Sequence, residues 1–187
     1  ETLDSLGVGD LDYLIASHYH QDHIGCTPDI LARRKVTKAA FDRGDSVETA
    51  SFGNKCYSAY VEAVGENRQT ADLSTPIQLD DGDVWISFVA VNGNETEASN
   101  ENDLGVVAVL HCGVFDLELG GDIGGYDRSG YEDIETPIIQ AVGRIEVYKV
   151  HHHGSQYSSN EEWLAAVQPK VGVISVGDGN SYGHPNA

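Results

Sequence analysis

The sequence contains no methionine, even at position 1, and only three cysteines and five prolines in 187 residues. The missing initiator methionine predicts that the chain is a processed product or a part of a longer protein. The cysteines, Cys26, Cys56 and Cys112, are an odd number at wide spacing. This spacing excludes a complete disulfide framework and a Cys-x-x-Cys metal clip. With 40% hydrophobic and 22% charged residues, the composition is that of a folded globular protein.

Basic residues are scarce. There are 11 Lys and Arg residues against 30 Asp and Glu residues, which gives a net charge of −19. Such an acidic surface repels nucleic acids and anionic membranes, so it argues against a simple nucleic-acid-binding module. Long hydrophobic runs are missing too, because the longest, 104–110 and 171–176, are far shorter than the roughly 20 residues of a membrane helix. We therefore predict no membrane contact from this segment.

The pattern of apolar and polar segments predicts an α/β fold with mixed sheets. A short buried strand, 12–16, leads into a polar cluster at 17–23, and Thr27 followed by Pro28 predicts the start of a helix over 29–40. Further strands are expected at 84–91, 104–110, 114–119, 145–150 and 171–176. Further helices are expected at 57–64, within 131–142 and at 160–167, where Ser159 and Glu162 form a capping box.

Histidines follow two of the predicted strands directly, at the end of the strand where open α/β sheets usually bind ligands. In an extended loop alternate side chains face the same side, so His18, His20 and Asp22 should converge while His23 points elsewhere. This pattern favours two metal ions, one bound by His18 and His20 and the other by Asp22 and His23. Three histidines and an aspartate within six residues are costly to desolvate without a cation.

A second set of candidate residues lies later in the chain. Asp122 follows a predicted strand, so its carboxylate is a candidate bridge between two ions, although a Gly-Asp pair alone is usually a turn. His152 and His153 follow the strand at 145–150. Neighbouring side chains at a strand end diverge, so only one of the two should reach a metal. Imidazole and carboxylate ligands suit zinc, and also manganese or iron when oxygen ligands dominate.

At these residues the chain resembles the metallo-β-lactamase fold superfamily, whose signature His-x-His-x-Asp-His is met by His18, His20, Asp22 and His23. Later segments resemble the hydrolase domain of ComEC-type DNA-uptake proteins, and secreted phosphorylcholine esterases share part of the pattern. These segments are Asn100-Glu101-Asn102-Asp103-Leu104, Gly120-Gly121-Asp122, Val150-His151-His152-His153-Gly154-Ser155 and Tyr182-Gly183-His184-Pro185.

The resemblance implies an αββα sandwich, the metallo-β-lactamase fold. Members of that superfamily begin with two or more strands before the histidine motif, and only about ten residues precede it here. We therefore expect residues 1–187 to be a single metallo-hydrolase domain that lacks its N-terminal strands. The resemblance also favours an extracellular or secreted location.

The resemblance further implies a ligand set of two divalent metal ions, zinc or manganese. The first site falls on His18 and His20, the second on Asp22 and His23, and the bridge on Asp122. The last histidine ligand falls on His152, with His153 as the alternative. The superfamily usually has another histidine before the Gly-Asp segment. That region holds Asn100, Asn102 and Asp103 here.

The function that these expectations favour is a dinuclear metal-dependent hydrolase of phosphoesters, specifically a phosphodiesterase. A metal-bound hydroxide would attack phosphorus with Asp22 orienting it. His153 would contact substrate, and His184 would protonate the leaving oxygen or hydrogen-bond a phosphate oxygen.

Two other functions stay open. One is a DNA-processing nuclease domain of a DNA-uptake protein, and the other is a non-catalytic, metal-bound extracellular binding domain. The acidic charge favours a small phosphoester over nucleic acid as the partner. A basic groove for DNA would first be sought at the one cluster of positive charge, Arg33, Arg34, Lys35 and Lys38.

Overall fold

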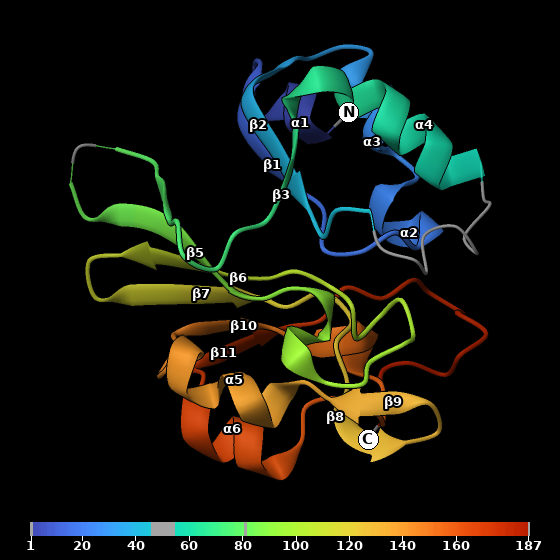
Figure 1. The fold of residues 1–187 in the computed structure, drawn as a ribbon, viewed down its shortest axis with the longest axis vertical. Coiled ribbons are helices and arrows are strands. Elements are labelled where there is room, and N and C mark those ends of the chain that lie inside the picture. The colour runs from blue at the N-terminus through green and yellow to red at the C-terminus, as the bar shows by residue number, and fades with distance from the viewer. Residues whose placement is uncertain (1, 46–54, 81, 187) are drawn as a thin grey trace. The chain divides into compact units, whose positions relative to one another are not determined.

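The computed structural model describes residues 2–45, 55–80 and 82–186, and the chain divides into two compact units (Figure 1). Unit 1 is Glu1–Ala71 and unit 2 is Asp72–Ala187. Both units combine helices with strands, so the predicted α/β class is confirmed.

Unit 1 is built around a sheet of three parallel strands in the order β1-β2-β3. Residues 17–20, which carry the first two histidines of the motif, follow β1 directly. The elements of this unit are α1 Thr2–Ser5, β1 Leu11–Ile15, α2 Gln21–Ile24, α3 Thr27–Leu31, β2 Val36–Asp42, α4 Lys55–Val64, the 3-10 turn η2 Gly65–Asn67, and β3 Arg68–Thr70.

The helix expected over 29–40 is wrong. Helix α3 ends at Leu31, and Val36–Asp42 forms β2, the middle strand of the sheet. The alanines and lysine of this stretch favour a helix by propensity. The strand also shows no alternating pattern, because the neighbours Ala39 and Ala40 are both buried and the neighbours Thr37 and Lys38 are both exposed. A short buried run of this kind cannot be distinguished from a helix by periodicity. The helix expected at 57–64 is confirmed by α4.

A buried ionic network closes the core of unit 1 at the ends of β2 and β3. The Arg68 guanidinium lies 2.7 Å from Asp42 Oδ2, and the Asp42 side chain is completely buried. Arg68 also donates to the hydroxyl of Tyr19 at 3.0 Å, and Tyr60 donates to Asp42 at 2.9 Å. Burial lowers the pKa of Arg68, but the hydrogen bonds and charge of Asp42 outweigh it, so the pKa is raised.

Unit 2 contains a six-stranded mixed sheet in the order β11-β10-β7-β6-β5-β4, together with the hairpin β8-β9. Its strands are β4 Ile77–Gln78, β5 Val84–Ala90, β6 Val107–Cys112, β7 Phe115–Leu119, β8 Gly125–Arg128, β9 Tyr131–Asp133, β10 Val147–Lys149 and β11 Val171–Val173. Its helices are α5 Glu135–Val142 and α6 Glu161–Val167, with 3-10 turns η3 Asn92–Glu95 and η4 His151–Gly154.

The central strands of this sheet follow the sequence prediction. Strands β6 and β7 form an antiparallel hairpin, and its turn includes Gly113 at φ 61°. Strand β10 pairs in parallel with both β7 and β11. As a result, the segments after β7 and β10 leave the sheet at the same edge. These are the segments that carry Asp122 and the three histidines at 151–153.

Helices α5 and α6 pack against one face of the sheet (Figure 1). The core between them contains Ile138 and Val142 from α5, Trp163 and Val167 from α6, and inward-facing strand residues that include Val107 and Val109. At the far end of the same face, His111 joins two neighbouring strands. It lies 2.9 Å from Ser87 Oγ and 2.7 Å from Asp116 Oδ1.

The start of α6 differs from the expected capping box. The N-cap is Asn160, whose side-chain oxygen accepts from the Trp163 N–H at 2.7 Å. Ser159 has φ 60°, and its hydroxyl pairs with that of Tyr148 instead. The expected helix over 160–167 itself is confirmed.

No helix in the described residues is long and apolar enough to cross a membrane. The three cysteines carry free thiols.

We expect Asn160→Ala to lower the free energy of unfolding by about 2 kcal/mol, because it removes the N-cap and the hydrogen bond to the Gly125 carbonyl. The matched control is Ser159→Ala, which removes one hydroxyl contact and should have less than half that effect. Urea denaturation followed by circular dichroism gives both values. If Ser159→Ala were the more damaging change, the capping box would be the correct description.

We expect Arg68→Met to destabilise unit 1 by about 3 kcal/mol, because it leaves the Asp42 carboxylate buried without its ionic partner. Lys38→Met is the control. It removes an exposed ion pair to Asp12 at 2.9 Å and should have a much smaller effect, because water screens that pair. The measurement is the urea midpoint of each variant. Equal midpoints for the two variants would contradict the role assigned to Arg68.

Candidate metal centre

In unit 1, the loop after β1 brings together the imidazoles of the histidine motif. His18 Nε2 lies 3.0 Å from His20 Nδ1. The Ser17 hydroxyl is 3.1 Å from His18 Nδ1 and 3.3 Å from His23 Nδ1, so it bridges two of the rings. The predicted strand-to-loop order therefore produces a cluster of nitrogen donors at the carboxyl end of β1.

The position of His23 differs from the expectation that alternate residues would face one point. Its ring centroid is 4.0 Å from that of His18. The reason is that Gln21–Ile24 forms a helical turn, α2, and this turn brings His23 back beside His18. Asp22 lies on the outer side of the turn, with a side chain that is 64% exposed and 3.6 Å from His23 Nε2.

Tyr19 anchors this loop in the core of unit 1. Its side chain is completely buried, and its hydroxyl donates to the Gly44 carbonyl at 2.8 Å and accepts from Arg68. Burial raises the pKa of Tyr19, so the phenol stays neutral. Tyr19 is the residue between His18 and His20 in the sequence. By holding the Tyr19 hydroxyl, the ionic network of β2 and β3 restricts the positions of both histidines. The sequence reasoning missed this role.

In unit 2, Asp122 and His153 are in direct contact. Asp122 Oδ2 is 3.2 Å from His153 Nε2, and the other ring nitrogen of His153 is 2.6 Å from the Ser175 carbonyl oxygen. The hydrogen bond with Asp122 raises the pKa of His153 to about 9, because it outweighs the effect of burial. His153, the alternative to His152 in the sequence prediction, is therefore the histidine that contacts the Asp122 carboxylate.

His152 lies on the other side of the same turn. Its ring is 5.5 Å from that of Tyr131 and 5.6 Å from that of His184, and its Nε2 is 3.5 Å from Asn102 Nδ2. Its backbone N–H donates to the Gly121 carbonyl at 3.1 Å, which ties this turn to the loop of Asp122. His152 and His153 have φ of 47° and 57°, a left-handed conformation that is unfavourable for non-glycine residues.

His184 lies near both of these histidines. Its ring is 6.4 Å from that of His153 and stacks on Tyr182 at 5.8 Å. The Asn180 side chain accepts from the His184 N–H at 3.0 Å and donates to its carbonyl at 2.8 Å, which holds the backbone in place. Burial lowers the pKa of His184, and the charge of His153 lowers it further.

Asp103 lies in the region where the resemblance implied a further histidine, and its carboxylate supports the surrounding backbone. It is buried and accepts backbone N–H groups from Gly124 at 2.7 Å and Glu132 at 2.9 Å. Burial raises its pKa despite these hydrogen bonds. Asn100 and Asn102 differ from it: Asn100 pairs with Asp103, whereas Asn102 reaches His152 and Tyr131.

A fully buried cluster of ionisable groups lies next to the segments that carry Asp122 and His153. The sequence analysis did not predict it. His151 Nδ1 is 2.6 Å from Glu135 Oε1, and His151 Nε2 is 2.9 Å from Glu118 Oε1. Burial opposes the charge on His151, but both carboxylates outweigh it and raise its pKa to about 9. Burial also raises the pKa of Glu118.

The donor chemistry of each unit suits a divalent metal. Unit 1 offers three clustered imidazoles and the Asp22 carboxylate, and unit 2 offers the Asp122 carboxylate beside His153. Neutral imidazole and carboxylate are the ligands that zinc and manganese prefer in proteins. The residues present therefore fit such a cofactor.

The positive cluster at which a basic groove for DNA would first be sought is largely paired. Arg34 lies 2.5 Å from Asp4 and also donates to the Val8 carbonyl, Arg33 lies 3.4 Å from Asp4, and Lys38 pairs with Asp12. The charge and hydrogen bonds of Arg34 hold the pKa of Asp4 below its usual value. These acidic partners reduce the local positive potential.

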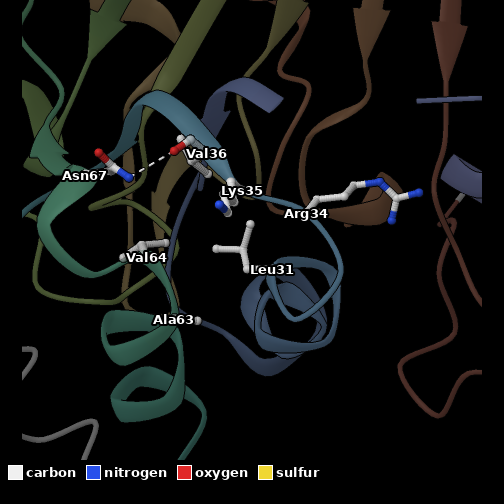
Figure 2. A pocket seen from close by; sticks show the side chains of 7 residues that line it. All are labelled: Leu31, Arg34, Lys35, Val36, Ala63, Val64 and Asn67. Atoms are coloured by element: carbon white, nitrogen blue, oxygen red, sulfur yellow. Dashed lines mark hydrogen bonds between the residues drawn. The ribbon is translucent and has the colours of Figure 1, made fainter. Parts of the chain in front are cut away.

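A hollow of about 200 Å³ lies beside this cluster. Figure 2 shows the side chains that line it. Leu31, Val36, Ala63 and Val64 form much of its wall, and Asn67 donates to the Val36 carbonyl at 2.9 Å. The Arg34 side chain extends away from the other lining residues (Figure 2). None of the described candidate ligands lines the hollow, so it is separate from the histidine cluster.

Comparisons with known proteins find related sequences that cover nearly the whole chain. The chain is 29% identical over 187 residues to ComE operon protein 3 of Bacillus subtilis, covering 98% of the chain and 22% of that protein. It is 26% identical over 180 residues to Recombination protein 2 of Haemophilus influenzae, covering 94% of the chain and 19% of that protein. The chain thus spans about a fifth of the length of these relatives.

The fold is shared with CmlA, a diiron β-hydroxylase from Streptomyces venezuelae. The TM-score is 0.53 at 11% identity, over 85% of this chain and 34% of CmlA. The model of the metallo-β-lactamase superfamily matches residues 1–178, which include the histidine motif, Asp122 and the histidines at 151–153. The chain therefore belongs to the metallo-β-lactamase superfamily.

Proposed function

We propose that this chain is a metal-dependent hydrolase that cleaves small phosphodiesters with two divalent ions. The observation that carries the proposal is the cluster of motif imidazoles in unit 1, where His18 Nε2 and His20 Nδ1 are 3.0 Å apart. Zinc or manganese would supply a Lewis acid that lowers the pKa of water and neutralises charge on the phosphate. Superfamily membership supports metal-dependent hydrolysis. The substrate class is supported by the resemblance of later segments to ComEC-type hydrolase domains and to phosphorylcholine esterases.

The chain's own residues have distinct parts in this proposal. His18 and His20 would hold one ion, Asp22 and His23 the other, and Asp122 would serve both. The contact of Asp122 with His153 supports His153, the alternative to His152, as the last ligand.

The remaining groups would act on the substrate. Asp22 would orient the attacking water, since its exposed carboxylate accepts hydrogen bonds. Whichever of His152 and His153 does not bind metal would contact the phosphate. His184, held by Asn180, would hydrogen-bond a phosphate oxygen or protonate the leaving oxygen.

A nuclease domain of a larger DNA-uptake protein is the second candidate, and the two curated relatives support it. The net charge of −19 and the acidic partners of Arg33, Arg34 and Lys38 argue for a small substrate instead. A non-catalytic metal-bound domain is the third candidate.

The metal proposal predicts up to two zinc or manganese ions per purified chain. The double variant His18→Ala with His20→Ala should lose about one of them, because it removes both imidazoles of one site. His111→Ala is the matched control, since His111 pairs with Ser87 and Asp116 on the sheet of unit 2. Elemental analysis after dialysis measures the stoichiometry. Metal content that stays unchanged in the double variant would remove the proposed site.

The catalytic proposal predicts turnover of bis(p-nitrophenyl) phosphate by the metal-loaded chain. Asp122→Asn should reduce that turnover by more than the roughly 10- to 100-fold typical of changes next to a metal ligand. Duplex DNA in the same assay should be cleaved weakly at low salt. If the chain cleaved neither substrate, the non-catalytic metal-bound domain would be the remaining candidate function. Tight DNA binding that weakens as salt rises would instead favour the nuclease candidate.

A further inference from the structure

The Glu118–His151–Glu135 cluster in unit 2 joins three segments around the Asp122–His153 contact. Glu118 is in β7, four residues before Asp122, and His151 precedes His152 directly. Glu135 is the first residue of α5. All three side chains are completely buried.

Each ring nitrogen of His151 faces a carboxylate oxygen, at 2.6 and 2.9 Å. Both nitrogens can therefore donate, which fixes the rotation of the ring. Glu135 also accepts the backbone N–H groups of Ser159 at 2.6 Å and Asn160 at 2.7 Å. The cluster thereby joins the end of β7, the turn after β10 and the starts of both helices.

The close packing around His151 constrains the backbone of the Asp122 loop. A Cβ atom at Gly120 would lie 2.2 Å from His151 Nε2 and 2.4 Å from Glu118 Oε1, so only glycine fits there. In the turn that carries the other partner of the contact, His152 and His153 have left-handed backbone conformations. Such conformations persist only where the surrounding structure enforces them.

Stability alone does not account for this cluster. Trp163 and Tyr148 pack against the imidazole, with ring centroids 5.3 and 4.8 Å away, so the surroundings are largely apolar. Apolar side chains of similar volume are often as stable as a buried ion pair, or more stable. What the ionic cluster adds is directionality, because hydrogen bonds fix the relative position of the groups they join.

We propose that Glu118, His151 and Glu135 are positioning residues, which hold the loop of Asp122 and the turn of His153 in the arrangement that brings these two side chains together. The inference deepens the proposed function, because that contact is part of the proposed metal centre. The three residues act through the backbone of the Asp122 loop and of the turn after β10.

The test uses the whole chain with Glu118→Leu, which removes one hydrogen bond to His151, and Glu118→Gln, whose amide oxygen can still accept it. Co²⁺ is the probe, because its ligand-field absorption reports the geometry of the ligands. We expect Glu118→Leu to weaken Co²⁺ binding about 10- to 100-fold and to change the absorption bands. Glu118→Gln should restore both to near wild type.

Val142→Ala is the matched control. Val142 is buried in the same core, on α5, and its truncation removes packing without removing a hydrogen bond of the cluster. It should lower the urea midpoint while leaving the Co²⁺ affinity and spectrum unchanged. If Val142→Ala changed the spectrum as much as Glu118→Leu does, loss of stability would explain the effect and the proposal would be overturned.

A second readout does not depend on metal. In the metal-free chain, long-range ¹⁵N–¹H spectra report the environment of the His153 ring nitrogens, assigned with His153→Gln. We expect these signals to shift in Glu118→Leu and to return in Glu118→Gln. If they shift while the wild type binds no Co²⁺, the positioning role holds and the proposed function fails. If neither the signals nor the spectrum changes in Glu118→Leu, the positioning role is wrong.

Discussion

Buried ion pairs determine where the candidate ligands of this chain can lie. In unit 1 the Arg68–Asp42 pair holds Tyr19, which lies between two motif histidines. In unit 2, two carboxylates hold His151, which precedes the other two histidines. Such pairs contribute little net stability, because desolvation offsets most of the attraction, but losing one partner is costly. They therefore act as constraints that permit one loop arrangement and penalise others.

This constraint explains why irregular backbone is found at the site. A turn with two consecutive left-handed histidines is unfavourable by itself. In the other loop, position 120 lies so close to His151 and Glu118 that it has no room for a side chain. Both segments follow strands that pair side by side in parallel, β7 and β10, so their ends are already close. The sheet brings the loops near one another, and the ionic cluster then sets their detailed arrangement.

The parts that the sequence predicted correctly depend on short-range patterns. Strand β1, the histidine loop after it, the hairpin of β6 and β7, and helix α6 were all readable from neighbouring residues. Two wrong predictions, a helix over 29–40 and an extended loop through His23, also have physical causes. Strand β2 lacks alternation because its neighbouring residues Ala39 and Ala40 are both buried. His23 faces His18 because four residues form a helical turn where an extended loop was expected.

The ionic anchors could not be predicted from the sequence, because their partners lie far apart in it. Glu118 and His151 are separated by 33 residues, and Asp42 and Arg68 by 26. Strand β7 reads Phe-Asp-Leu-Glu-Leu, an alternation that predicts Asp116 and Glu118 on the solvent face, yet Glu118 is the buried residue of the strand. A charged side chain is almost never fully buried unless it is paired, so a charge at a core position implies a partner that only the fold can identify.

The same acidic composition bears on substrate size. With a net charge of −19, the surface repels any polyanion, and the positive residues between 33 and 38 are largely paired with carboxylates. At physiological salt this repulsion falls off over about 8 Å. A small phosphodiester carries one negative charge, so its approach to the site costs little electrostatic free energy. A long nucleic acid presents many charges to the acidic surface around the site. Divalent ions bound by the motif residues would reverse the field only locally, so the charge of this chain supports the proposed small phosphodiester over a long nucleic acid.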